Sequence, residues 1–279
     1  MSPHEKPFLT TDWRLLAMLN YEVDPQILLP LLPQGTELNA YQGKTFVSMV
    51  GFRFERTRLL GWPVPFHQQF PEVNLRFYVR RRVDDRWRRG VVFVREIVPR
   101  RAAAFIARTV FDENMTAMPV RCEVEPGNET QSLASVEYRW RYRGQWQRLA
   151  VQTSGLPQPP VEGSQQQFIT EHYWGYTAHA NGSTSEFRVD HPSWKTWQAR
   201  TSLLQCDAAG LYGPQFAEFL SGRPDSALVA EGSPVKVYRG KLLQLGVEQI
   251  PTENQLSEEN IGLRARLDFS PEKDGVGVT

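Results

Sequence analysis

The sequence has few cysteines, no long apolar run and almost no net charge. Its 279 residues include only two cysteines, Cys122 and Cys206, which lie far apart in the chain. This number excludes a disulfide framework and a thiolate metal site, and it favours two buried, reduced thiols. No apolar run approaches the roughly 18 residues of a membrane-spanning helix, and the N-terminal residues have no signal-peptide pattern. We therefore expect a cytoplasmic protein with no membrane partner.

The charge balance argues against a polyanionic partner. The net charge is +1, with 23% charged residues, so no global field favours nucleic acid. One local exception is the run 80–89, which holds six arginines and Trp87 around Asp84-Asp85. Basic stretches with interleaved aromatics can bind single-stranded nucleic acid, but a turn at the two aspartates makes this a solvated hairpin tip. We favour the hairpin and predict no nucleic-acid partner.

The hydrophobic pattern predicts a β-rich protein. With 41% hydrophobic residues, the chain can bury a large core. Residues 45–53 are apolar on both faces, as in a central strand, and residues 135–143 alternate between apolar and charged. Strands are also expected at 13–23, 72–82, 91–98, 120–124, 185–189 and 233–245, and short helices at 25–32 and 214–220. We predict turns at 126–128 and a loop at 155–163, and a barrel or sandwich of mostly antiparallel strands with peripheral helices.

The sequence predicts one folded domain followed by a C-terminal segment. Residues 1–245 are expected to form a single domain. Residues 246–279 are polar and form a C-terminal extension, which we expect to be partly disordered.

The stretch 91–111 contains charged residues in unusual places. Its first half reads as a buried strand, and its Ala-rich second half predicts a helix that begins at Pro99. Glu96 shares a strand face with Val92, Val94 and Val98, where a carboxylate needs a partner. Arg100 and Arg101 fall in the first helical turn, where the helix dipole disfavours cations. Either a ligand anion and Glu96 satisfy these arginines, or the arginines face water and Glu96 pairs elsewhere.

Several of these segments together resemble the YqjF-like family of bacterial proteins of unknown function. The matching segments are 19–25, 48–52, 63–67, 72–79, 95–101 and 171–175, and the resemblance covers roughly residues 8–245. The family name conveys no activity.

More remotely, the layout is similar to acetoacetate decarboxylase, a β-barrel enzyme that forms a Schiff base through a lysine. The resemblance implies that Arg14 and Glu72 correspond to a pocket arginine and a pocket glutamate, and that Glu96 and residues 99–101 correspond to a Glu…Pro-Lys-Lys signature. Here arginines replace the lysines. Because guanidinium stays protonated and forms no imine, Schiff-base decarboxylation is not expected. The resemblance also implies a homo-oligomer.

These observations predict a pocket for a small anionic metabolite, such as an organic or keto acid. We name Glu72 and Arg100 as candidate catalytic residues, with Glu72 as the acid/base. Ligand-binding candidates are Arg14, Glu96, Arg101, Trp62, Phe66, His67, His172, Tyr173 and Trp174. For His67 and His172, a satisfied aromatic-cluster histidine is the alternative. The histidine spacing predicts no metal, and no cofactor motif is present. A non-covalent lyase or hydrolase, a sensing module and a ligand-free salt-bridge network remain open.

Overall fold

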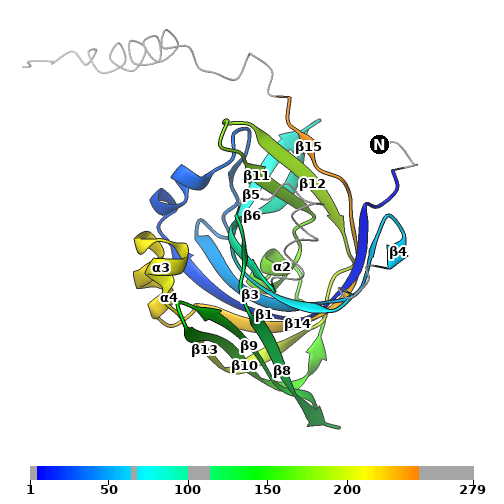
Figure 1. Cartoon of the computed structure of the whole chain (residues 1–279), viewed down its shortest axis with the longest axis vertical. Helices are drawn as coiled ribbons and strands as arrows, with labels where there is room; N and C mark the ends of the chain where they lie inside the picture. The colour runs from blue at the N-terminus through cyan, green and yellow to red at the C-terminus, as the bar shows by residue number, and fades with distance from the viewer. Residues whose placement is uncertain (1–4, 64–67, 100–113, 245–279) are drawn as a thin grey trace, which may run out of the picture. The chain divides into compact units, whose positions relative to one another are not determined.

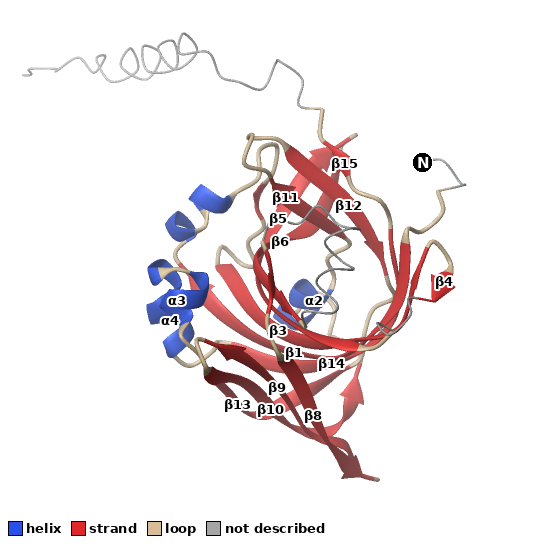
Figure 2. Cartoon of the chain, in the orientation of Figure 1, coloured by secondary structure: helices blue, strands red, loops and turns tan. Residues whose placement is uncertain are grey.

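The computed structural model describes residues 5–63, 68–99 and 114–244. Contacts divide the chain into two units, Met1–Leu243 and Gln244–Thr279, and the fold described below belongs to the first. It is built from strands, with a few short helices (Figures 1 and 2). The β-rich architecture predicted from the sequence is therefore confirmed.

The main feature is a closed ring of strands. Its order is β12-β11-β6-β5-β3-β1-β14, and β14 pairs with β12 to close it (Figure 1). All of these pairs are antiparallel except β6 with β11. The ring strands are β1 (Leu9–Val23), β3 (Thr45–Leu59), β5 (Phe70–Val83), β6 (Arg86–Val98), β11 (Trp174–Ala178), β12 (Thr184–Asp190) and β14 (Ser226–Val237).

Further strands continue from β14 and cover the outside of the ring. Their order is β13-β10-β9-β8, with bounds Thr196–Gln205, Gln145–Gln158, Gln131–Tyr142 and Val120–Asn128. Short strands β2 (Glu37–Leu38), β4 (Trp62–Pro63), β7 (Met115–Ala117) and β15 (Lys241–Leu242) pair at the margins. We call β13, β10, β9 and β8 the extension strands. Because the extension strands fold back over β1, β3 and β5, both faces of these ring strands are buried.

Two hydrophobic clusters follow from this arrangement. The inner cluster lies inside the ring, with Phe46, Val50 and Phe52 from β3. The outer cluster lies between the ring and the extension strands, where Val47 and Met49 contact side chains from β9 and β10. The strand predicted to be central is therefore central, because each of its apolar faces has a cluster to join.

The described helices are short. Helix α2 (Gln165–Thr170) begins at Ser164, whose side chain accepts a hydrogen bond from the Gln167 amide, and it adds Phe168 and Ile169 to the inner cluster. Helices α3 (Ala208–Tyr212) and α4 (Ala217–Ser221) pack on the outer cluster. The predicted helix at 25–32 is instead a pair of 3₁₀ helices, Pro25–Ile27 and Leu29–Leu31, because Pro30 cannot supply the hydrogen bond of a continuous α-helix.

Of the turns and loops predicted from the sequence, some are confirmed and others are wrong. The turn at Asp84-Asp85 is confirmed, and both residues have positive φ, as a two-residue hairpin requires. The turn predicted at 126–128 is wrong, because β8 continues to Asn128 through a bulge at Pro126. The loop predicted from Gly155 begins later, because β10 extends to Gln158. The helix predicted to begin at Pro99 lies outside the described residues.

The remaining findings concern thiols and membrane spans. Cys122 and Cys206 form no disulfide, as expected, but both are half-buried rather than buried. In the part of the chain that the structure describes, no helix combines the length and apolarity that a membrane crossing needs.

Candidate functional site

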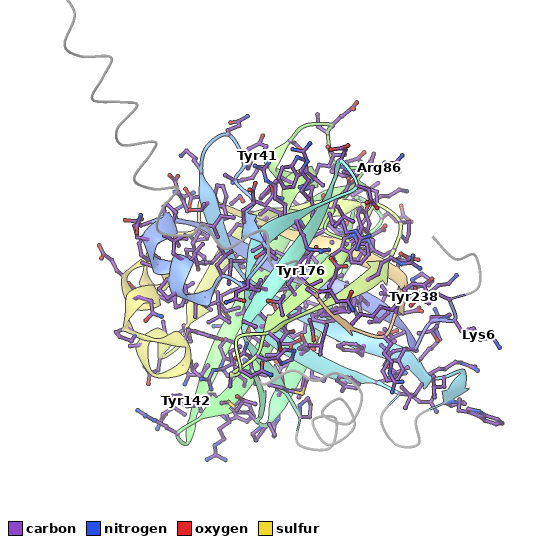
Figure 3. All side chains as sticks on the ribbon, turned by 90° about the horizontal axis from the view of Figure 1, so that it is seen from above. Lys6, Tyr41, Arg86, Tyr142, Tyr176 and Tyr238 are labelled. Carbon is purple, nitrogen blue, oxygen red and sulfur yellow. The ribbon has the colours of Figure 1, made fainter. Side chains whose placement is uncertain are left out.

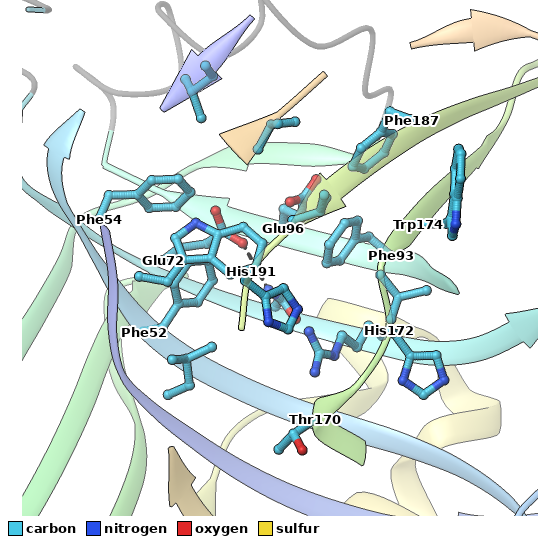
Figure 4. Close-up of a pocket in the computed structure, with 18 of the residues that line it drawn as sticks. Phe52, Phe54, Glu72, Phe93, Glu96, Thr170, His172, Trp174, Phe187 and His191 are labelled. Carbon is cyan, nitrogen blue, oxygen red and sulfur yellow. Dashed lines mark hydrogen bonds between the residues drawn. The ribbon is translucent and has the colours of Figure 1, made fainter. Parts of the chain in front are cut away.

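A cavity lies inside the ring and is lined by residues of most ring strands (Figure 4). Its volume is about 100 Å³. Its walls are mainly aromatic and aliphatic, with a small polar group on one side. The polar members are Glu72, Asn74, Arg76, Glu96, Thr170, His172 and His191, and the aromatic members are Trp13, Phe52, Phe54, Phe70, Phe93, Trp174, Phe187 and Trp194.

Strand β5 supplies the first part of the polar group. Glu72, Asn74 and Arg76 alternate along this strand, so they point to one face, and that face is the interior of the ring. The intervening Val73 and Leu75 point to the outer cluster. The polar face of β5 is buried because the ring closes around it, and the apolar face is buried because the extension strands cover it.

Strand β6 supplies Glu96 through a β-bulge. Asn74 pairs with Glu96 and Arg76 pairs with Phe93, so an extra residue of β6 is accommodated between them. The prediction that Glu96 shares a face with Val92 and Val94 is therefore wrong: Glu96 and Phe93 face the cavity, whereas Val92 belongs to the outer cluster.

Arg76 is the cation of this cavity. Its residue is 9% exposed, and among the described residues it makes no ion pair within 4.0 Å. Its Nη2 lies 3.8 Å from Met18 Sδ, and its Cζ lies 5.8 Å from the centroid of the Tyr78 ring. Its Nε is buried and has no hydrogen-bond partner. A buried guanidinium without a carboxylate is costly, because burial removes hydration that nothing replaces.

Three further polar atoms at the cavity lack partners. Trp13 Nε1, Asn74 Oδ1 and His172 Nδ1 are buried and make no hydrogen bond. All three residues line the cavity. Since buried polar atoms are normally satisfied, unsatisfied donors on Arg76 and Trp13 indicate a place for an acceptor.

Two carboxylates line the same cavity. Glu72 and Glu96 are 3% and 8% exposed, and Asn74 Nδ2 donates a 2.9 Å hydrogen bond to Glu72 Oε1. Because Glu96 is paired with Asn74, Glu72 and Glu96 occupy diagonal positions, which are about 7–8 Å apart in a sheet. Figure 4 shows both carboxylates on the same side of the cavity, near His191.

The two histidines of the cavity are neutral at ordinary pH. Burial, aided by the charges of Arg89 and Arg76, holds the pKa of His172 well below its usual value. Its Nε2 accepts a 3.2 Å hydrogen bond from Asn39 Nδ2, and its ring packs on Tyr78 at 4.6 Å. Burial also lowers the pKa of His191, whose ring stacks on Trp194 at 4.1 Å. Arg76 is therefore the positive charge among the described lining residues.

The structure brings together four of the predicted site residues. Glu72, Glu96, His172 and Trp174 line the cavity. Three others are placed elsewhere. Arg14 pairs with Asp12 at 2.9 Å, Trp62 is 78% exposed at the margin of the ring, and Tyr173 packs on His191 without being among the lining residues. Phe66, His67, Arg100 and Arg101 lie outside the described residues.

The sequence analysis missed Arg76, Asn74 and His191. A signal for Arg76 was present, since it is a charged residue in the middle of a strand whose neighbours Leu75 and Phe77 are apolar. It also shares its strand face with Glu72. No comparable signal marked His191, which lies in a loop after β12.

The described residues also bear on covalent and metal chemistry. No lysine is among those that line the cavity. Across the described part of the chain, no three or more His, Cys, Asp or Glu side chains are grouped as metal ligands.

Comparisons with known proteins identify relatives of this chain in sequence and in fold. The chain is 27% identical over 207 residues to the uncharacterized protein YqjF of Bacillus subtilis, covering 73% of this chain and 82% of that one. An acetoacetate decarboxylase from Legionella pneumophila has a similar structure, with a TM-score of 0.57, 14% identity and coverage of 86% and 88%. The enduracididine biosynthesis enzyme MppR complexed with pyruvate gives a TM-score of 0.58, 13% identity and coverage of 87% and 92%. At 13–14% sequence identity, these similarities show a shared fold and nothing about activity. The model of the DUF2071 family, described as "uncharacterized conserved protein", matches residues 10–234, so the chain belongs to this family.

Proposed function

We propose that the ring cavity binds a small organic acid, or a related metabolite, and that Arg76 binds its carboxylate. The observation that carries the proposal is the buried guanidinium of Arg76, which has no ion pair among the described residues. Arginine and carboxylate form paired, charge-assisted hydrogen bonds, which are about twice as strong as neutral ones. A bound carboxylate would supply both the missing charge and the missing acceptor.

The cavity restricts the ligand to a small molecule. Its volume of about 100 Å³ is below the roughly 300–1,000 Å³ of sites for drug-sized ligands. By the same measure a water molecule needs about 10–15 Å³, so the space exceeds that of a single water. The aromatic walls favour a short apolar carbon portion beside the carboxylate.

The similar structures support keto acids as the first class to test. MppR is recorded in complex with pyruvate, a 2-keto acid, and the name of acetoacetate decarboxylase specifies a 3-keto acid. Lysine is absent from the described lining, and arginines stand at positions 100 and 101. We therefore propose non-covalent recognition rather than a Schiff base.

A catalytic role is a second candidate, favoured by the buried carboxylate of Glu72 at the cavity wall. In a lyase or hydrolase of non-covalent type, Glu72 would move a proton and Arg76 would stabilise the enolate-like charge. A sensing module would use the same residues for binding alone. Turnover of a keto acid separates these two functions.

A thermal-shift screen tests the binding proposal. Small carboxylic and keto acids are compared with their uncharged amides and alcohols, which match them in size. We expect stabilisation by one or more acids and none by the matched neutral compounds. No shift with any acid would instead favour the salt-bridge interpretation of the charged residues. The expected homo-oligomer and cytoplasmic location stay predictions, and light scattering at several protein concentrations tests the former.

A further inference from the structure

A second candidate site lies on the ring near the β5–β6 hairpin tip. It is a groove of about 970 Å³. Its charged members are five cations and three acids: Arg86, Arg88, Arg188, Arg239 and Lys241, and Glu5, Asp84 and Glu186. Figure 3 shows Arg86 and Tyr238, which both line this groove, on the same side of the molecule. We call it the basic groove.

The acids of the basic groove do not neutralise its arginines. Glu186 is 9% exposed, and both of its carboxylate oxygens are engaged, one by Arg88 at 2.5 Å and the other by Arg81 at 3.3 Å. This triad retains a positive charge. Arg188 Nε lies 3.1 Å from Asp190 Oδ1, and Lys241 Nζ lies 3.0 Å from Glu5 Oε1, so each of these cations has one carboxylate partner. Among the described residues, the exposed Arg86 and Arg239 make no ion pair, so the groove keeps a net positive charge.

Aromatic rings hold several of these guanidinium groups in place. Arg188 lies over the Tyr238 ring, 3.8 Å from its centroid, and Arg88 lies over Trp174 at 4.2 Å. Stacking on an aromatic face fixes the plane of a guanidinium and costs it little hydration. The side chain then loses less entropy when it binds an anion, so the arginines are pre-organised for one.

The arrangement favours phosphate over a single carboxylate. A phosphate monoester carries about −1.5 to −2 charge and three acceptor oxygens, so it can contact several guanidinium groups at once. The volume of the groove is within the roughly 300–1,000 Å³ typical of ligand sites. Asp84 and Glu5 also line the groove, and their carboxylates would repel a long polyanion.

We propose that the basic groove binds a small phosphorylated molecule through Arg88, Arg188 and Arg239. The site is distinct from the ring cavity, although Trp174 lines both. Its ligand is therefore independent of the acid proposed for Arg76.

Titration calorimetry with pyrophosphate tests this inference. We expect binding that weakens with added salt, as for partly exposed charges. Arg188→Gln and Arg239→Gln should each raise the dissociation constant about tenfold, the loss of one charge-assisted contact. Arg239 is exposed, so its substitution leaves folding intact. The matched control is Arg200→Gln, which removes an exposed arginine on β13 outside the groove and should leave affinity unchanged.

Three outcomes would overturn the proposal. The first is no binding heat from pyrophosphate at low salt, and the second is an Arg200→Gln variant that weakens binding as much as the groove variants do. A single-stranded oligonucleotide that binds more tightly as it lengthens, and more tightly than pyrophosphate, would assign the groove to nucleic acid instead.

Discussion

The substitution Arg76→Gln separates a ligand-binding arginine from a structural one. Glutamine keeps hydrogen-bonding capacity at a similar length but removes the charge and the paired donors. If Arg76 binds the carboxylate, the variant should fold and lose most of its response to an acid. If Arg76 only stabilises the fold, the variant should melt earlier and respond as the wild type does.

The expected size of the effect follows from the contacts. An acid at a hundred times its dissociation constant stabilises the wild type by about 2.7 kcal/mol, or about 5–11 °C at roughly 2–4 °C per kcal/mol. Losing charge-assisted hydrogen bonds worth about 1.5–3 kcal/mol raises the dissociation constant about 10- to 150-fold. At the same acid concentration the variant then gains only about 0.3–1.4 kcal/mol.

The assay is differential scanning calorimetry with and without the acid that the screen identifies. Arg14→Gln is the matched control, because Arg14 lies on β1 but pairs with Asp12 and does not line the cavity. Its acid-induced shift should equal that of the wild type. The reasoning is refuted if Arg76→Gln retains the full shift, or if Arg14→Gln loses it.

Three further predictions concern the fold, its pH dependence and catalysis. Gly232 has φ +80°, and an added Cβ would lie 1.9 Å from the Trp13 carbonyl oxygen. Gly232→Ala should therefore lower the free energy of unfolding in urea by about 3 kcal/mol or more. Gly43 has the same φ but open space around it, so Gly43→Ala should lower it by only about 1–2 kcal/mol. The pKa of His172 is lowered in the folded protein, so the unfolded chain takes up a proton at this residue first as the pH falls. The free energy of unfolding should therefore fall by up to about 1.4 kcal/mol per pH unit below pH 6.5. His172→Gln should flatten that slope in denaturant titrations, and equal slopes for variant and wild type would contradict this. If a keto acid is turned over, Glu72→Gln should retain the thermal shift and lose the turnover, and unchanged turnover would remove Glu72 from the mechanism.

Local patterns in the sequence predicted much of the secondary structure. Strand β3 was recognisable because Phe46, Val50 and Phe52 alternate with Val47 and Met49, and each set joins its own cluster. The hairpin turn at residues 84–85 was visible from its two aspartates. In both cases the signal lies within a few residues of the structure that it specifies.

The candidate site was harder to predict because it depends on long-range pairing. The ring closes through Val189–Val237 and Asp190–Lys236, which lie far apart in the sequence. Strict alternation also put Glu96 on the wrong face, because the β6 bulge shifts the register between Leu75 and Arg76. Such a bulge leaves little trace in a single sequence.

Arg76 escaped notice for a related reason. A charge in a strand is usually assigned to a wet face, but ring closure buries the face of β5 that carries Arg76, and β8, β9, β10 and β13 cover the other face. The arginine named by family resemblance, Arg14, is instead paired with Asp12.

The most direct measurement of the central claim is the ¹H–¹⁵N signal of Arg76 Nε during titration with the acid. Arg76→Gln assigns the signal by removing it. Because Arg76 Nε is buried and has no partner among the described residues, a new hydrogen bond should move its resonance strongly. We predict that this signal shifts and saturates together with the thermal stabilisation. An unmoved Arg76 signal at saturating acid would contradict the account and place the acid elsewhere.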